Sequence, residues 1–404
     1  MHRRAVPRCP IAMGESGRRV LSSLVAVLAI ALALSAGAVP GSTVGTAPQV
    51  AGSWRLLPQA PIGEASQGFT GVWTGSRMIV FGGVTSVDGE GTRTYAGAVY
   101  DPATDTWSPL PDVRSGNPYG YKTVWTGHEM VAFSGLGSYA YEPQTGRWRP
   151  LPSGGGFGGV LAWTGRELIA WGGGCCAEAS NAGSAYNPAT NRWRKIARSP
   201  LAPSQNPLGA WTGRELVVLV TGIEPNVPKR YPASFARAAA YNPTTDTWRR
   251  IAPVPDPRFS WDGAAATWDG REVLVVGGTS ATPRGMQGRL VRTPLAYNPR
   301  TNRWRRLAPM GTGRADFAAV WTGKRLLVWG GRTTRGGPPQ RPPQGFAYTP
   351  ATNRWSRLPQ APLRGRLDPT PVWTGKAMIV WGGGTQRPPY QSFTDGASFT
   401  SAAP

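Results

Sequence analysis

The sequence predicts an all-β protein, a seven-bladed β-propeller of four-stranded antiparallel blades, on three observations. A segment that begins Trp-Thr-Gly or Trp-Asp-Gly and continues as a short apolar run recurs seven times in 404 residues. A second element, Tyr-x-Pro-x-Thr-x-x-Trp, follows each of the first six copies. No segment has the period of about 3.6 residues that marks an amphipathic helix. Four short strands in a unit of about 50 residues are typical of a propeller blade.

Each repeat divides into four expected strands. The first carries the Trp of Trp-Thr-Gly, and the Thr-Gly suits a tight hairpin because glycine accepts a positive φ. The second is the apolar run, and the third ends at the Tyr, where Asn-Pro or Asp-Pro makes a turn because proline fixes φ. The fourth begins at the second Trp. The first Trp of each repeat stands at Trp73, Trp125, Trp163, Trp211, Trp268, Trp321 and Trp373.

The seventh repeat is divided between the two ends of the chain. After Trp373 the sequence reaches Phe399, where the Tyr is expected, and has no fourth-strand Trp. Residues 54–62, WRLLPQAPI, match 355–363, WSRLPQAPL, which form the fourth strand of the sixth repeat. We therefore expect the N-terminal strand that starts at Trp54 to close the last blade, which removes a sheet edge.

The Gly-Gly doublet, the Tyr, the Trp seven residues later and the Pro-rich linker resemble the kelch repeat over residues 53–400. The resemblance implies a bacterial secreted kelch-like protein with the propeller of the galactose oxidase central domain. It implies little about activity, because one fold hosts unrelated functions. The copper radical oxidases of this kind use two His ligands with Tyr and a cross-linked Cys. Only His128 lies beyond the expected leader, in a predicted turn. We therefore expect no copper site, no other metal and no cofactor.

Residues 1–38 are expected to be an export signal peptide. Basic residues precede an apolar run from Leu21 to Leu34, which is too short to span a bilayer. Small residues at Ala36 and Ala38 suit cleavage after Ala38. The general secretory route and, from Arg18-Arg19, the twin-arginine route both remain open. We expect a flexible linker at 39–52, the propeller at 53–404, and a secreted monomer without a membrane span.

The chain is strongly basic. Lys and Arg number 44 against 21 Asp and Glu, and removal of residues 1–38 lowers the net charge only from +23 to +19. This charge would attract a glycan, another anionic cell-surface polymer or an acidic protein. The alternative is that the positive charge has no function and reflects only a drift of the amino-acid composition toward Arg. Nucleic acid is not expected as a partner, because no known nucleic-acid-binding module occurs.

The two faces of the ring differ in sequence. The first and third turns of every blade lie on one face, the turn face, and they repeat Thr-Gly and Asn-Pro-x-Thr. The second loops and the connectors between blades lie on the other face, the loop face. The interval that contains the second loop varies from 23 to 37 residues, whereas the one that contains the connector varies from 15 to 20. Because variable loops on a rigid frame usually carry binding, we expect the ligand on the loop face.

The connectors lead into the innermost strands and so ring the central channel. They contain Arg and Asp that could grip a sugar or a carboxylate, since Arg offers two parallel donors. The alternative is that these Arg residues pair with carboxylates or carbonyls of neighbouring blades. The candidate ligand-binding residues of this funnel are Arg114, Arg258, Asp262, Arg314, Asp316, Arg366 and Asp368.

Cys175 and Cys176 are adjacent in the loop of the third repeat. Export favours a disulfide between them. Two free thiols, or a metal or redox role, are the alternatives.

These observations predict a binding or interaction module for a glycan, cell-wall polymer or protein, with no catalytic residue assigned. The alternative is a carbohydrate-active enzyme like the sialic acid mutarotases, which would use Arg and Asp of the funnel. A purely structural scaffold is the third possibility.

Overall fold

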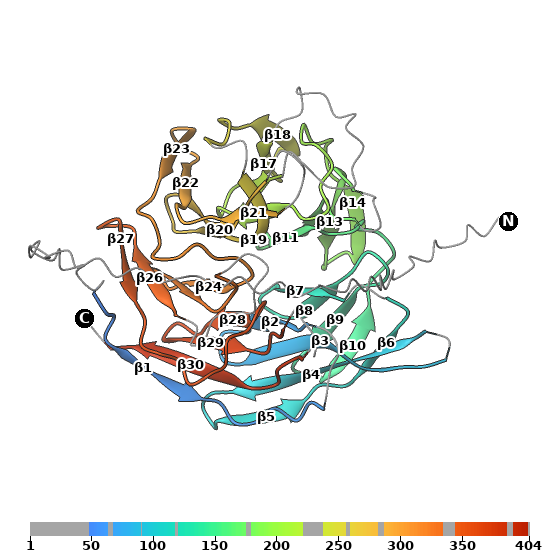
Figure 1. Ribbon diagram of the computed structural model, residues 1–404. Coiled ribbons are helices and arrows are strands. Elements are labelled where there is room, and N and C mark those ends of the chain that lie inside the picture. The colour runs from blue at the N-terminus through green and yellow to red at the C-terminus, as the bar shows by residue number, and fades with distance from the viewer. Residues whose placement is uncertain are drawn as a thin grey trace, which may run out of the picture. The chain divides into compact units, whose positions relative to one another are not determined.

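The computed structural model describes residues 48–63, 68–89, 91–117, 120–174, 179–220, 237–255, 259–281, 287–333, 344–385 and 391–402. In these ranges the regular elements are strands, and none is a helix that could cross a membrane. The strands form seven sheets around one axis (Figure 1). Each sheet has a four-stranded antiparallel path, so the predicted seven-bladed β-propeller is confirmed.

The first three blades follow the chain from the innermost to the outermost strand. Blade 1 consists of β2 (Thr70–Trp73), β3 (Met78–Val87), β4 (Arg93–Asp101) and β5 (Thr106–Pro109), with β6 (Val113–Ser115) paired to β4. Blade 2 consists of β7 (Lys122–Trp125), β8 (Met130–Phe133), β9 (Tyr139–Glu142) and β10 (Arg147–Pro150). Blade 3 consists of β11 (Val160–Trp163), β12 (Leu168–Trp171), β13 (Gly183–Asn187) and β14 (Arg192–Lys195).

The next three blades repeat this order. Blade 4 consists of β15 (Leu208–Trp211), β16 (Leu216–Leu219), β17 (Ala238–Asn242) and β18 (Thr247–Arg250). Blade 5 consists of β19 (Phe259–Trp268), β20 (Val273–Ala281), β22 (Leu295–Asn298) and β23 (Arg303–Arg306), with β21 (Gln287–Leu290) paired to β20. Blade 6 consists of β24 (Ala318–Trp321), β25 (Leu326–Trp329), β26 (Phe346–Thr349) and β27 (Arg354–Arg357).

Blade 7 joins the two ends of the chain, as predicted. It consists of β28 (Thr370–Trp373), β29 (Ala377–Trp381), β30 (Gly396–Ser401) and β1 (Gly52–Leu56). The blue β1 lies beside the red β30 in Figure 1, and Trp54 stands opposite Phe399 in their antiparallel register. The innermost strand β28 contacts β2 of blade 1 and β24 of blade 6, which closes the ring.

The residues just before β1 also belong to the propeller. The Val50 amide donates to the Arg357 carbonyl at 2.8 Å, and the Arg357 amide donates to the Pro48 carbonyl at 2.9 Å. The segment assigned by sequence to the linker therefore pairs with the outer edge of β27 before it enters blade 7. It ties blade 6 to blade 7 through main-chain hydrogen bonds.

The Trp residues of the fourth strands hold each blade to the one before it. Each indole N–H donates to a main-chain carbonyl of the preceding blade's connector, at 2.8–3.1 Å. Since a buried indole N–H needs an acceptor, this bond fixes the ring in place while its apolar face fills the space between the sheets. The seven residues are Trp54, Trp107, Trp148, Trp193, Trp248, Trp304 and Trp355.

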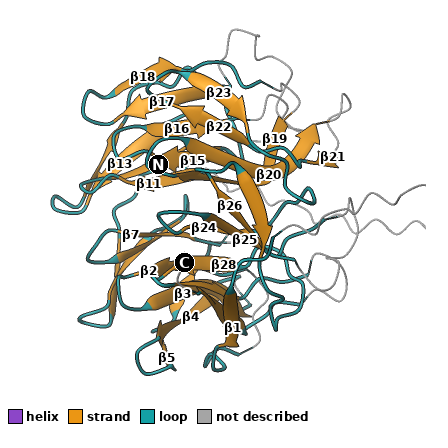
Figure 2. Ribbon diagram, turned by 90° about the vertical axis from the view of Figure 1, so that its left-hand side faces the viewer, coloured by secondary structure: helices purple, strands orange, loops and turns teal. Residues whose placement is uncertain are grey.

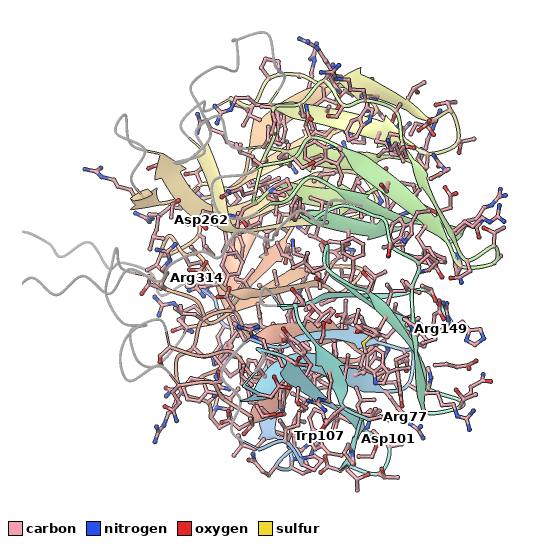
Figure 3. All side chains as sticks on the ribbon, turned by 90° about the vertical axis from the view of Figure 1, so that its right-hand side faces the viewer. Arg77, Asp101, Trp107, Arg149, Asp262 and Arg314 are labelled. Carbon is pink, nitrogen blue, oxygen red and sulfur yellow. The ribbon has the colours of Figure 1, made fainter. Side chains whose placement is uncertain are left out.

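The two faces differ as the strand order requires. Figure 2 shows short turns along one side of the molecule and β19, β20 and β21 reaching out on the other. In Figure 3, Arg77, Asp101 and Arg149 lie at the turn face, and Asp262 and Arg314 lie at the opposite, loop face. Residues from the connectors therefore meet on the loop face, around the innermost strands.

Candidate functional site

The mouth of the central channel on the loop face is the candidate site. The position five residues before the first Trp of each repeat lies where the chain enters the innermost strand. Three blades have a residue other than glycine at this position: Asn206 in blade 4, Asp316 in blade 6 and Asp368 in blade 7. The other four blades have glycine there. Polar groups thus gather on one part of the mouth.

Main-chain hydrogen bonds hold this part of the mouth together. The Asp368 amide donates to the Asp316 carbonyl, and the Asp316 amide donates to the Gly263 carbonyl, both at 2.9 Å. A Cβ on Gly263 would lie 2.2 Å from the Asp316 carboxylate, so only glycine leaves room for that side chain. Connectors of blades 5, 6 and 7 are therefore joined edge to edge at the channel.

Arg332 connects two of the three predicted aspartates. Its Nε lies 2.6 Å from Asp316 Oδ2, and its Nη2 lies 3.4 Å from Asp262 Oδ2. The Arg332 side chain is 8% exposed and that of Asp262 is 43% exposed. Burial raises the pKa of Asp316, and the adjacent guanidinium of Arg332 opposes this rise. Arg332 thus holds Asp316 in place and leaves Asp262 open to solvent.

Asp368 completes the cluster without a partner of its own. Among the described residues, its carboxylate makes no hydrogen bond or ion pair, and its side chain reaches solvent. Its position among the channel walls and the charge of Asp316 raise its pKa to about 6. A carboxyl group that titrates near neutral pH can accept or donate a proton, or bind a hydroxyl group in either state.

Arg314 and Arg366 are buried and bonded within their own blades, whereas the alternative to a ligand-binding role predicts pairing with neighbouring blades. Their exposures are 1% and 0%. Each Nη1 donates at 3.1 Å to the carbonyl of the first glycine in the Gly-Gly doublet of its own blade, Gly330 or Gly382. Arg366 also pairs with Asp395 at 2.7 Å. The two guanidinium groups brace the base of the loops and do not line the mouth.

The remaining predicted residues lie elsewhere. Arg114 is in β6, on the extended loop of blade 1, where it pairs with Asp88 at 2.8 Å. Arg258 and the pair Cys175 and Cys176 lie outside the described residues. Of the seven predicted residues, the structure brings Asp262, Asp316 and Asp368 together.

A pocket of about 270 Å³ lies across the loop face of blades 2, 3 and 4. Two large apolar side chains on its wall reach solvent, Leu136 at 50% and Phe157 at 40% exposed. Polar groups of Lys122, Gln205 and Asn206 line the same pocket. An exposed ring beside amide and ammonium groups offers a stacking surface together with directed hydrogen bonds.

Lys122 is the cation of this pocket. Its ammonium group donates to the Gly159 carbonyl, which lies in the connector to blade 3. Burial among the channel walls lowers its pKa to about 8, so the charged form prevails at neutral pH. Its three N–H donors exceed the one hydrogen bond that it makes to the described residues, so it can bind an additional acceptor. The mouth thus has a cation over blades 2 and 3 and carboxylates over blades 5 to 7.

Sequence reasoning missed Lys122, Arg332 and Phe157. The first two could have been found by comparing the repeats, because Lys122 is the only charged residue three positions before the first Trp, and Arg332 the only one directly after the Gly-Gly position. Phe157 lies in a glycine-rich connector without a repeated pattern, so no comparison of the repeats singles it out.

The described residues do not provide a copper site of the kind found in copper radical oxidases. No group of three or more His, Cys, Asp or Glu in these ranges is arranged to hold a metal ion. His128 is exposed on the turn face, with its Nε2 3.6 Å from Glu142.

Comparison with known proteins agrees with the repeat analysis. Residues 262–311 match the family model of the kelch motif. The chain is 24% identical over 207 residues to "Kelch-like protein terF" of Aspergillus terreus, which covers 51% of this chain and 44% of that protein. It is 28% identical over 178 residues to "Kelch-like protein 36" of Mus musculus, covering 44% and 27%. The chain thus spans less than half the length of these curated relatives.

Two solved structures share the architecture. "Structure of YjhT" superposes with a TM-score of 0.52 at 16% identity, over 74% of this chain and 99% of that one. "Novel fungal alcohol oxidase with catalytic diversity among the AA5 family, in complex with copper" gives a TM-score of 0.60 at 13% identity, over 87% and 76%. At these identities the likeness is one of fold alone.

Proposed function

Because the chain is a kelch-repeat β-propeller, we propose that it is an exported binding module that holds a glycan on its loop face. The observation that carries the proposal is the pocket where Phe157 and Leu136 are exposed beside Lys122 and Asn206. Sugar rings present apolar C–H faces and hydroxyl groups, which an exposed aromatic ring and an amide side chain bind. The Lys122 ammonium favours an acidic sugar, whose carboxylate it can bind.

The carboxylates across the mouth extend the same surface. Asp262 and Asp368 both reach solvent there, and carboxylate oxygens accept hydrogen bonds from sugar hydroxyls. A glycan chain that enters the channel mouth from the pocket would meet these acceptors next. The signal peptide expected at 1–38 would bring the protein to the compartment where such polymers occur, which supports the proposal.

The test is a glycan array of neutral and acidic oligosaccharides, probed with residues 39–404. We expect binding of acidic glycans, loss of binding for Phe157→Ala and weaker binding for Lys122→Met. Arg214→Ala, on the turn face, is the matched control and should bind as the unaltered protein does. Absence of glycan binding, or retained binding by Phe157→Ala, would overturn the proposal and favour a protein partner.

A second candidate function is suggested by the place of Asp368, which is exposed beside Asp316 at the channel mouth and whose pKa is raised to about 6 by burial and by the charge of Asp316. General acid–base catalysis of sugar ring opening, as in a mutarotase, needs a group that titrates near the working pH. Anomeric exchange of N-acetylneuraminic acid, followed by NMR, tests this function. Acceleration that Asp368→Asn abolishes would support it, and exchange at the uncatalysed rate would exclude it for this sugar.

A further inference from the structure

The turn face carries a groove between adjacent blades at two described places. One, the reference groove, lies between blades 3 and 4 and is lined by Glu167, Arg194, Trp211 and Asp246 among others. The second, the seam groove, lies between blades 6 and 7, where the ring closes. It has a volume of about 450 Å³, and its charged lining residues are Lys324, Arg325 and Lys376.

In blades 2 to 5 the repeat provides a carboxylate on this face. A Glu four residues after the first Trp pairs with an Arg one residue after the fourth-strand Trp. The donor–acceptor distances of these ion pairs are 2.6–2.8 Å. The pairs are Glu129 with Arg149, Glu167 with Arg194, Glu215 with Arg249, and Glu272 with Arg305.

Blade 6 has neither member of that pair. Arg325 stands at the Glu position and Ser356 at the Arg position. Blade 1 also has an Arg at the Glu position, Arg77, but its Nε lies 2.9 Å from Asp101 in the same blade (Figure 3). The residue of blade 6 that corresponds to Asp101 is Thr349, which carries no charge. Arg325 has therefore lost both carboxylates that serve this position elsewhere.

The closure of the ring also removes a third carboxylate that could pair with Arg325, the one in the turn between the third and fourth strands. In blade 4 the turn between the third and fourth strands adds Asp246 to the reference groove. In blade 7 this turn is replaced by the two ends of the propeller, and Val50, Ser401 and Ala402 line the seam groove instead. Among the described residues, the side chains of Lys324, Arg325 and Lys376 make no hydrogen bond or ion pair.

We propose that the seam groove is a binding site for a small phosphorylated molecule. Three cations that meet no carboxylate among the residues that the structure describes favour a ligand group with two negative charges over a monovalent carboxylate. Arg offers phosphate two parallel donors, and Lys binds it as a point charge. Leu327 and Trp373 form an apolar wall, and the volume exceeds the need of a bare phosphate, so an organic body has room beside them.

Titration calorimetry of residues 39–404 with inorganic phosphate tests this site. We expect one phosphate per chain. Arg325→Ala should weaken binding by about tenfold, as loss of a charge-assisted hydrogen-bond pair does. Arg214→Ala is the matched control, because Arg214 occupies in the reference groove the position that Lys376 occupies in the seam groove. This control should bind phosphate as the unaltered protein does.

The ligand class is tested with three further probes. Glucose 6-phosphate should bind at least as tightly as inorganic phosphate, and glucose or acetate should not bind at the groove. No saturable phosphate binding at millimolar concentrations would overturn the proposal. Equal phosphate affinity of Arg325→Ala and the unaltered protein, or acetate that binds as tightly as phosphate, would also overturn it. Thermal unfolding of Arg325→Ala checks that a loss of binding is not a loss of fold.

Discussion

The reference groove and the seam groove occupy equivalent positions in the same ring and differ in charge balance. In the reference groove, Arg194 lies 2.8 Å from Glu167 and 3.6 Å from Asp246. In the seam groove, Arg325 replaces the Glu, and Val50, Ser401 and Ala402 replace the turn that carries the Asp. Between residues 273 and 404 the sequence has three acidic residues, Asp316, Asp368 and Asp395, and all three lie on the loop-face side of their blades.

Where the repeat is kept, its Glu and Arg side chains form ion pairs with each other. Where a residue departs from the repeat, as Arg325 does, its charged group can bind a ligand instead. The same reasoning applies at the channel mouth. Lys122, Asp316 and Asp368 each replace a small or apolar residue found in most other blades.

The largest effect is expected from removal of the closing strand. A chain that begins at residue 58 lacks β1, its pairing with β30 and the indole bond from Trp54 to Pro359. Truncation of a fully buried Trp costs about 3–5 kcal/mol; Trp54 is partly buried, so its loss alone should cost less, and the lost strand pairing adds to it, against a stability of about 5–15 kcal/mol. We expect aggregation or a lost unfolding transition by calorimetry. A chain that begins at residue 48 is the control and should melt as residues 39–404 do; equal melting of all three would contradict the closure.

A smaller effect is expected from breaking one ion pair of the frame. Glu215→Gln removes a carboxylate that is 16% exposed and that accepts two hydrogen bonds from Arg249, at 2.7 and 3.0 Å. Because Arg249 is partly exposed, solvent screening limits the cost to about 1–2 kcal/mol of unfolding free energy. Arg325→Gln removes no partner and should change stability by less than about 0.5 kcal/mol. Urea unfolding of both variants measures the two changes in unfolding free energy. Equal decreases would contradict the claim that Arg325, unlike Arg249, has no carboxylate partner among the described residues.

A pH effect of about 1 kcal/mol is expected from Asp368, after allowance for its contact with solvent. Its pKa is raised from 3.8 to about 6, so the folded state holds the proton more tightly than the unfolded chain. The stability that this proton contributes is present below pH 3.8 and is lost as the pH rises through about 6. Asp316, Asp262 and Arg332 face the group and shift its titration.

The variant Asp368→Asn removes this titration. Its unfolding free energy, measured by urea denaturation across this pH range, should fall less with rising pH than that of the unaltered protein. Parallel profiles for the two proteins would show that Asp368 titrates normally, and would also remove the basis for acid–base catalysis at the mouth.

The fold could be predicted from the sequence because the repeat encodes it many times over. The two Trp positions and the Tyr locate the strands, and the match of 54–62 to 355–363 locates the closing strand. The roles of the site residues were harder to predict from the sequence. Arg314 and Asp316 are two residues apart in one connector, yet one donates to buried carbonyls and the other pairs with Arg332 of the aspartate cluster. Sequence spacing does not separate these roles, since both depend on which loop packs above them.

The seam groove shows the same limit. An alignment of the repeats shows that Arg325 stands where blades 2 to 5 have Glu. It does not show that Trp373, Val50 and Ala402 lie beside Arg325, and only this arrangement makes the missing equivalents of Asp101 and Asp246 matter. Residues far apart in the sequence, such as Val50 and Ala402, come together with these cations only in the folded ring.

The most direct test of the account compares the two grooves in one spectrum. Trp211 lines the reference groove and Trp373 lines the seam groove at the equivalent position. In ¹⁹F NMR of protein labelled with 5-fluorotryptophan, with both signals assigned by Trp→Phe variants, a phosphate titration should shift the Trp373 signal and leave that of Trp211 in place. Equal shifts of the two signals, or no shift of Trp373, would contradict the claim that the break in the repeat creates a binding site.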